Sequence, residues 1–184
     1  MDFDRDKFKA WVLYAIWRTS HYESFGATKL NKALWFPEAR SFQAYGKPIT
    51  GETFLRDKYG PRSKHLAEIL LELEADSQIE PFEEHLGNFI VKRHRVLVPA
   101  PISTFTKEEL GLIDWWIHHI AEDHSASSIS RFSHDYAWEI AEIGEELPLH
   151  SFLASRIRPP QSDEEKLWAR EQAKLQGDIE IIPF

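Results

Sequence analysis

The chain contains no cysteine among its 184 residues. This absence excludes disulfide bonds, zinc sites built on thiolates and cysteine nucleophiles in one step. It also fits the reducing cytoplasm, where we expect the protein to act. The first eight residues, MDFDRDKF, lack the basic and then apolar layout of a secretory signal. We therefore do not expect export.

Long apolar runs and positive charge are also scarce. The most apolar stretch, residues 112–120, contains Asp114 and two histidines and falls far short of the roughly 20 residues that a membrane span needs. The 22 Lys and Arg residues are outnumbered by 30 Asp and Glu residues, which gives a formal net charge of -8. This balance disfavours general affinity for nucleic acid and suits a partner with a basic face.

The eight glycines are scattered, and none forms a GxGxxG or GxxxxGK[ST] phosphate loop. Hydrophobic residues make up 42% of the chain and aromatic residues 13%, which is enough to bury one sizeable core. We expect one helical domain with a small hairpin over residues 1–158. A charged helix and tail over residues 159–184 follow from a capping box, Ser162 to Glu165, and the stretch EEKLWAREQAKLQG.

Apolar residues recur at the three-and-four spacing of helices in most of the chain. This spacing predicts helices over residues 3–19, 28–45, 63–76, 106–120 and 125–143. Thr28 and Ser63 are expected to begin the second and third, and a capping box, Thr106 to Glu109, the fourth. Pro37 should kink the second helix, and the fifth should break near Phe132 and Ser133.

Residues 79–84 and 88–98, separated by a short linker with Gly87, predict an antiparallel hairpin whose second arm is rich in β-branched residues. Because two strands alone are marginal, we expect residues 53–59 to supply a third strand, followed by a turn at Gly60 and Pro61. The predicted fold class is α+β and predominantly α-helical, a helical bundle with a small two- or three-stranded antiparallel sheet.

Nine histidines raise the possibility of a metal site, with the densest group at His118, His119 and His124. Metal sites need three or more converging ligands, and adjacent helical residues are splayed by about 100°. We favour ordinary pairs at one-turn spacing, Asp114 with His118 and His119 with Asp123. A metal-dependent hydrolase around His118, His124 and His134 is the weaker hypothesis, so we expect no metal.

Ser133, His134 and Asp135 have the residue types of a hydrolase triad, but consecutive side chains cannot align as nucleophile, base and orienting group. Instead, we expect Ser133 to cap a helix that begins at His134, with Asp135 in its first turn.

A basic strip, Lys92 to Arg95, offers an alternative function. Arg93 and Arg95 would point the same way from a hairpin, as in a DNA-binding transcriptional regulator. The favoured interpretation is the polar face of an edge hairpin that resists aggregation, so a nucleic-acid partner is not expected.

The seven tryptophans divide between core and surface. Trp11, Trp116 and Trp138 fit core positions, whereas Trp17, Trp35 and Trp115 would be natural anchors for a partner protein if they are exposed together.

Four segments occur in order between Leu30 and Pro148: LNKALWF, YGKPITG, KYGP before a leucine-rich helix, and FSHDYAW with GEELP. In order and spacing they resemble the Panacea domain of SocA-like antitoxins, although Pro37 and the extension after Pro159 depart from the pattern. The resemblance implies a non-enzymatic antitoxin without a cofactor that neutralises a cognate toxin by direct binding. SocA-like members can also deliver the toxin to a cytoplasmic protease.

The resemblance assigns structural or partner-binding roles, and no catalytic task, to nine motif positions. They are Lys29, Tyr45, Gly46, Tyr59, Gly60, Pro61, Ser133, His134 and Trp138. The toxin's identity and the oligomeric state do not follow from the sequence.

Overall fold

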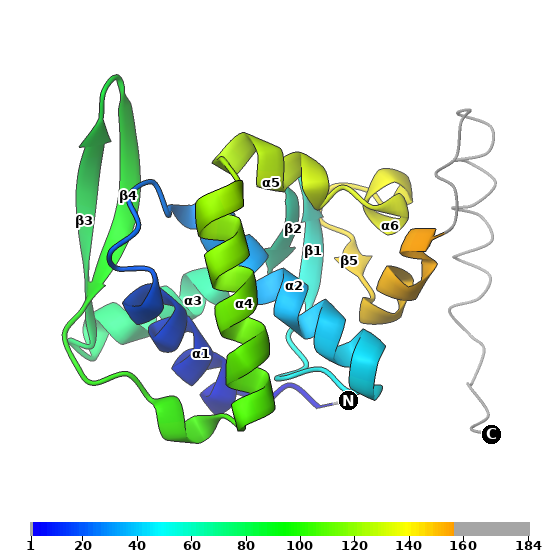
Figure 1. Cartoon of the computed structure of the whole chain (residues 1–184), viewed down its shortest axis with the longest axis horizontal. Coiled ribbons are helices and arrows are strands. Elements are labelled where there is room, and N and C mark those ends of the chain that lie inside the picture. The colour runs from blue at the N-terminus through cyan, green and yellow to red at the C-terminus, as the bar shows by residue number, and fades with distance from the viewer. Residues whose placement is uncertain (1, 157–184) are drawn as a thin grey trace.

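The computed structural model describes residues 2–156. This part contains six α-helices and two small antiparallel sheets (Figure 1), as the predicted α+β, mainly helical class requires. The helices are α1 Arg5–Arg18, α2 Ala27–Tyr45, α3 Leu66–Ala75, α4 Lys107–Asp123, α5 Ala126–Phe132 and α6 Tyr136–Ile140, with 3-10 segments η1 Ile102–Thr104 and η2 Leu149–Arg156. The strands are β1 Phe54–Asp57, β2 Gly60–Ser63, β3 Ile79–Leu86, β4 Phe89–Val96 and β5 Glu146–Leu147. Within the described range no helix is long and apolar enough to cross a membrane.

The first sheet has the strand order β2-β1-β5 and does not include the hairpin. Our prediction that residues 53–59 join the hairpin is therefore wrong. The chain turns tightly after Asp57, so that β1 pairs with the strand directly behind it, Asp57 opposite Gly60. Gly60 and Pro61 accordingly begin β2 and do not form the turn themselves. Pro61 is tolerated because β2 is an edge strand.

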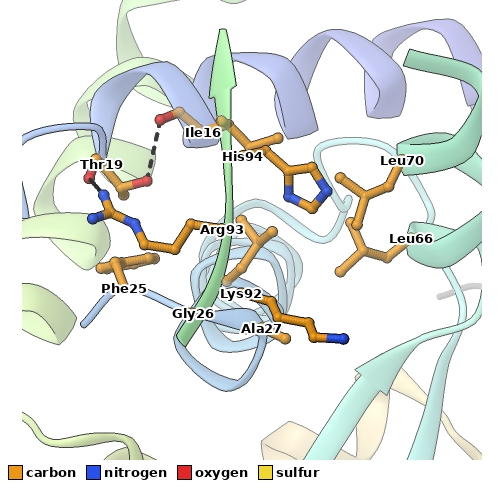
Figure 2. Close-up of a pocket in the computed structure, with 11 residues that line it drawn as sticks. Ile16, Thr19, Phe25, Gly26, Ala27, Leu66, Leu70, Lys92, Arg93 and His94 are labelled. Atoms are coloured by element: carbon orange, nitrogen blue, oxygen red, sulfur yellow. Dashed lines mark hydrogen bonds between the residues drawn. The ribbon is translucent and has the colours of Figure 1, made fainter. Parts of the chain in front are cut away.

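Strands β3 and β4 form the predicted hairpin as a separate sheet. The missing third strand is replaced by helices, since β4 lies against α1 and β3 against α3. Arg93 of β4 extends to the end of α1, where its guanidinium donates to the carbonyl oxygens of Thr19 and Ser20, each at 3.1 Å. Figure 2 shows this side chain beside an apolar pocket of about 100 Å³ between α1, α3 and β4.

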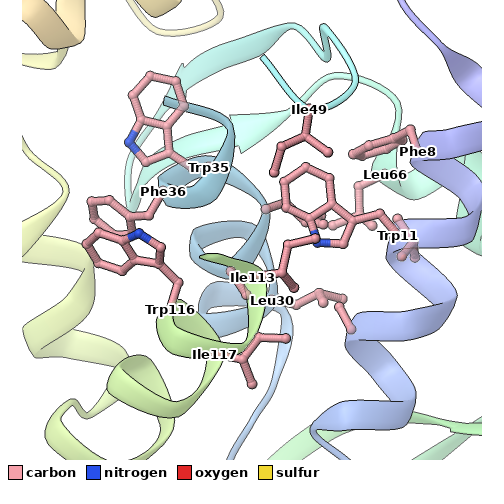
Figure 3. Packing of buried hydrophobic residues seen from close by; sticks show 14 of the residues in the cluster. Phe8, Trp11, Leu30, Trp35, Phe36, Ile49, Leu66, Ile113, Trp116 and Ile117 are labelled. Carbon is pink, nitrogen blue, oxygen red and sulfur yellow. The ribbon is translucent and has the colours of Figure 1, made fainter. Parts of the chain in front are cut away.

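The core is built around α2, which packs against α1, α4, α5 and β2. Trp11 of α1, Trp35 and Phe36 of α2 and Trp116 of α4 are at most 3% exposed and meet in one cluster (Figure 3). The rings of Phe36 and Trp116 stack with centroids 4.4 Å apart. Burying a large apolar side chain contributes about 1.5–3 kcal/mol, so these contacts fix the position of α2 against α4.

The ends of several helices test the capping predictions. The Thr106 and Glu109 capping box is present in full, and α5 and α6 are separate as expected. Ser63 accepts the N–H of Leu66 at 3.0 Å, although α3 begins only at Leu66. The helix expected in residues 159–184 lies outside the described residues.

Helix α2 departs from the prediction at its start. It begins after Gly26 with no capping side chain among the described residues, so the prediction that Thr28 caps it is wrong. A Cβ at Gly26 would lie 2.7 Å from Val91 Cγ1 of the hairpin, which explains why no larger capping residue fits there. The helix continues past Pro37 and ends, as predicted, at Gly46, whose φ is 69°.

A buried carboxylate holds the loop that follows α2. Glu38 is 0% exposed and accepts the N–H groups of Ile49 at 2.7 Å, Thr50 at 3.0 Å and Glu52 at 3.0 Å, and the Thr50 hydroxyl at 2.8 Å. Burial raises the pKa of Glu38, and these donors oppose the rise. Glu52 continues the chain of contacts, because its carboxylate accepts the N–H of Lys64 at 3.0 Å, just before α3.

We expect Glu38→Gln to lower the free energy of unfolding by roughly 1–3 kcal/mol, measured by urea denaturation. The amide has one acceptor oxygen and would turn its own N–H donors towards backbone N–H groups. Glu68→Gln is the matched control, since the Glu68 side chain is 61% exposed beside Arg5 and should cost less than about 0.5 kcal/mol. Equal losses in the two variants would contradict a special role for Glu38.

Candidate functional site

Motif positions from distant parts of the sequence meet around one buried lysine. Lys32 of α2 lies against Gly60 and Pro61 of β2, and Ser133 at the end of α5 lies against the same glycine. We call Lys32, Gly60, Pro61, Ser133, His134 and Trp138 the Lys32 cluster. Trp138 of α6 is tied to β1, because its Nε1 donates to the Asp57 carbonyl oxygen at 2.9 Å.

Lys32 is 2% exposed, and its Nζ donates to the Pro61 carbonyl oxygen at 2.7 Å. Burial lowers the pKa of Lys32 to about 7, and the negative charge of Asp57 opposes this fall. The amine is therefore poised to gain or lose a proton near neutral pH.

Gly60 leaves no space for a side chain. Its φ is 91°, and a Cβ would lie 2.2 Å from Ser133 Oγ and 2.9 Å from Lys32 Nζ. A glycine is required here by both the left-handed backbone and the close approach of α2 and α5.

Ser133, His134 and Asp135 have separate structural tasks. Ser133 is the C-cap residue directly after α5 and donates its hydroxyl to the Ser130 carbonyl oxygen at 2.7 Å. Asp135 caps α6 by accepting the Trp138 N–H at 2.9 Å, so the prediction of a helix capped by Ser133 and starting at His134 is wrong. A carboxylate placed three residues before Trp138 reaches the free N–H of the first turn.

His134 lies with its ring stacked on Trp138, at a centroid distance of 3.5 Å. Burial lowers the pKa of His134, and the nearby charge of Lys32 lowers it further. The Ser133 hydroxyl is directed to a backbone carbonyl and the His134 ring to Trp138, an arrangement that differs from a nucleophile hydrogen-bonded to its base.

The remaining motif positions lie outside the Lys32 cluster or at its rim. Lys29 is 3% exposed, and its Nζ donates to the Ala121 carbonyl oxygen of α4 at 3.3 Å. Gly46 ends α2, next to Tyr45, which is 63% exposed. Tyr59 is 57% exposed in the turn between β1 and β2.

The histidines of α4 make the kind of contacts expected of surface side chains. His119 Nδ1 lies 2.7 Å from Asp123, as predicted. His118 instead contacts the Tyr22 hydroxyl at 3.2 Å, and Asp114 accepts from Tyr14 and pairs with Arg18. Among residues 2–156, no three His, Asp or Glu side chains are grouped to hold a metal ion.

The basic strip of β4 is largely occupied by intramolecular contacts. Arg93 is 7% exposed and donates to both carboxylate oxygens of Glu84, at 2.9 and 2.8 Å. Arg93 and Arg95 do share a face, each 5.4 Å from the Phe82 ring. The exposed Arg95 pairs with Glu80 at 2.6 Å, so the strip presents little free positive charge.

An exposed row of aromatic rings runs along α4 to α5. Trp115 stacks on His119, His119 contacts His124, and His124 contacts Phe132, with ring centroids 5.0, 5.0 and 5.5 Å apart. We call these four residues the aromatic row; Trp115 and Phe132 are each 56% exposed. Beside Trp115, an open groove of about 340 Å³ separates α4 from Tyr45 at the end of α2.

The tryptophans predicted for the core are buried, whereas only two of the three considered for the surface are exposed. Trp11, Trp116 and Trp138 are all buried, and Trp35 is buried with them. Trp115 is exposed, as is Trp17 at 42%.

Residues 30–139, from the first turn of α2 through most of α6, match the family model described as antitoxin SocA-like, Panacea domain. The match covers more than half of the chain and contains the whole Lys32 cluster. The chain therefore belongs to the SocA-like antitoxin family with the Panacea domain. No curated protein and no solved structure matches it.

Two residues at the centre of this arrangement were missed from sequence alone. Lys32 and Glu38 are charged residues on α2, a helix whose remaining positions are mostly apolar and buried. The available signal was a lysine between Leu30 and Ala33 inside the apolar stripe of LNKALWF.

We expect Gly60→Ala to destabilise the fold by about 1–3 kcal/mol more than Gly144→Ala, measured as the difference in urea unfolding. Both glycines have positive φ, 91° and 85°, so backbone strain is common to the two variants. Gly144 has no described atom within 4 Å of the added Cβ, whereas Gly60 faces Ser133 and Lys32. Equal losses would show that crowding at Gly60 is unimportant.

We also expect the free energy of unfolding of the protein to depend on pH through Lys32. The pKa of Lys32 falls from 10.5 in the unfolded chain to about 7 in the fold. Between these values the unfolded chain binds more protons, so the lysine's contribution to stability rises with pH by up to about 1.4 kcal/mol per unit.

Lys32→Met removes this titration while keeping an unbranched side chain that is only one atom shorter. The difference in stability between the protein and the variant should therefore change between about pH 7 and about pH 10.5, and the protein should become more stable relative to the variant as pH rises. A constant difference across this range would show that Lys32 keeps its ordinary pKa.

Proposed function

We propose that this protein is a non-enzymatic antitoxin that neutralises a cognate toxin in the cytoplasm by binding it directly. The observation that carries the proposal is the family match over residues 30–139. The matched range contains most of α2, all of α3 and α4, and strands β1 to β4. Direct binding is the mode that the family resemblance implies, and it requires neither a cofactor nor a metal.

The aromatic row supports a protein partner. Large aromatic side chains at the centre of interfaces supply much of the binding energy, and exposed apolar patches mark interaction sites. Trp115 and Tyr45 flank the groove between α2 and α4, with the buried Trp116 also lining it. A groove of this kind accepts an apolar side chain from a partner.

The charges of α4 suit a basic segment of the toxin. Glu108 at one end of the helix and Glu122 and Asp123 at the other are exposed. An arginine from the partner can stack on the exposed ring of Trp115, and the acidic residues at the two ends of α4 add a long-range field that favours a cation.

The structure offers less support for the alternatives. A DNA-binding regulator built on the hairpin would need Arg93, whose guanidinium is buried against Glu84 and the end of α1. A hydrolase around His118, His124 and His134 would need convergence, yet His134 stacks on Trp138 while His124 lies in the aromatic row.

Co-expression with the product of the adjacent gene tests the proposal. We expect restored growth and co-purification of the two proteins. The toxin's half-life in the same cells separates two modes: unchanged when the toxin is only held, shortened when it is delivered to a protease. A toxic neighbour that is neither rescued nor co-purified would contradict the proposed function.

We expect Trp115→Ala to weaken toxin binding by about 30-fold, which corresponds to the roughly 2 kcal/mol typical of an interface anchor. Phe89→Ala is the matched control, because Phe89 is a 75% exposed aromatic residue at the start of β4, far from the row in sequence. Isothermal calorimetry gives both affinities, and circular dichroism should show both variants folded. Loss of binding in Phe89→Ala alone would move the toxin site to the hairpin.

A further inference from the structure

A second recess opens beside the Lys32 cluster, apart from the groove at Trp115. It measures about 170 Å³ and lies between the start of α2 and the β1–β2 turn. Thr28, Asn31 and Lys32 line it from the helix, and Asp57, Tyr59, Gly60 and Arg62 from the strands and turn. We call this recess the Lys32 pocket. Its lining is rich in hydrogen-bond donors.

The surroundings of the Lys32 pocket are positively charged, although the whole chain carries a net charge of -8. Residues 54–63 contain Arg56, Lys58 and Arg62 and a single acidic residue, Asp57. Arg62 Nε donates to Asp57 at 2.9 Å, and Asp57 also accepts from the Lys58 N–H, so the charges of Arg62 and Asp57 offset each other and the segment keeps a net charge of +2 through Arg56 and Lys58. The remaining positive charge favours an anionic ligand.

Lys32 supplies a buried donor at this pocket. A protonated amine has three N–H groups, and the Pro61 carbonyl oxygen accepts one of them. A hydrogen bond from a buried ammonium to an anion is both charge-assisted and shielded from water. The side chain is 2% exposed, so it is held in place without needing to be ordered on binding.

The start of α2 contributes a further favourable field. The helix is 19 residues long, and no side chain in the described part of the chain caps its first turn. Ala27 and Thr28 of that turn line the pocket. The partial positive charge of a helix start stabilises a negative group placed there.

We propose that the Lys32 pocket binds an oxyanion, a carboxylate or a phosphate group, through Lys32 and Arg62. The ligand group occupies the recess in front of the helix start, and Tyr59, 57% exposed, closes one side. This inference does not depend on toxin binding through the aromatic row, since the two sites use different residues.

Proton uptake distinguishes this site from a nonspecific one. Near neutral pH the amine of Lys32 is partly unprotonated, and an anion favours its charged form. Binding must therefore take up a fraction of a proton, a signature that an ion at exposed lysines would not give.

The test is a titration of the full chain with inorganic phosphate at constant ionic strength, followed by amide chemical shifts and by calorimetry in two buffers of different ionisation enthalpy. We expect saturable shifts confined to residues 27–32 and 57–62. Because phosphate itself titrates near neutral pH, the proton uptake by Lys32 at about pH 7.5 is read as the excess over the uptake in Lys32→Met. Acetate in a parallel titration distinguishes the sources: saturation by acetate as well identifies a carboxylate as sufficient, and saturation by phosphate alone identifies a phosphate ligand.

Variants assign the effect to the pocket. Lys32→Met should remove the share of proton uptake that belongs to the lysine and weaken binding at least about tenfold. Arg62→Gln, at a side chain that is 43% exposed, should weaken binding while leaving the core intact, and so keeps the test valid if Lys32→Met does not fold. Lys47→Met, an exposed lysine outside the pocket, should behave as the unmodified protein. Absence of saturation with both anions, or equal affinities in Arg62→Gln and Lys47→Met, would overturn the proposal.

Discussion

The carboxylate of Glu38, enclosed by the loop of residues 49–52, is the interaction on which the rest of the structure depends. Helix α2 is buried on most of its surface, so the chain that leaves it must pass its polar backbone through the core. Glu38 accepts three backbone N–H groups and one hydroxyl there, and unpaired donors at this depth would each cost about 1–3 kcal/mol. Glu52, in the same loop, accepts the N–H of Lys64 and so holds the chain just before the start of α3. The loop in turn fixes where β1 begins, and thereby brings Gly60 against Lys32.

Helix α2 buries three charged side chains, and they differ in how well they are compensated. Glu38 has four donors, and Lys29 has a carbonyl oxygen and the ring of Phe25. Lys32 is the more deeply buried of the two lysines. Its amine donates to the Pro61 carbonyl oxygen, and the charge of Asp57 acts on it from further away. An apolar residue of similar length would avoid the desolvation cost of several kcal/mol. Stability alone therefore does not account for Lys32, whereas the proposed oxyanion would give the buried amine a charged partner.

Helical periodicity and capping residues predicted most helices, because those signals are local: the stripe of α4 and the Thr106 box are complete within the sequence itself. The third strand was misplaced because strand pairing depends on where the chain turns. The turn at Lys58 and Tyr59 reverses the chain, so that β1 pairs with β2 and not with the hairpin. The motif positions Gly60, Pro61, Ser133, His134 and Trp138 were selected by family resemblance, and the structure brings them together. Their centre was missed because a lysine in an apolar stripe gives no indication of whether its amine reaches solvent.

Helix α5 joins the two surfaces on which the proposals rest. Phe132, at the end of the aromatic row, is exposed, and the next residue, Ser133, is 2% exposed against Gly60. Because Ser133 Oγ and Lys32 Nζ approach the same glycine, displacement of the end of α5 by a partner would change the space available to the amine. Packing in the core resists such displacement, since Phe132 also contacts Phe36, which stacks on Trp116. Helix α5 therefore borders both surfaces: Phe132 lies in the aromatic row, and the adjoining Ser133 lies against Gly60 in the Lys32 cluster.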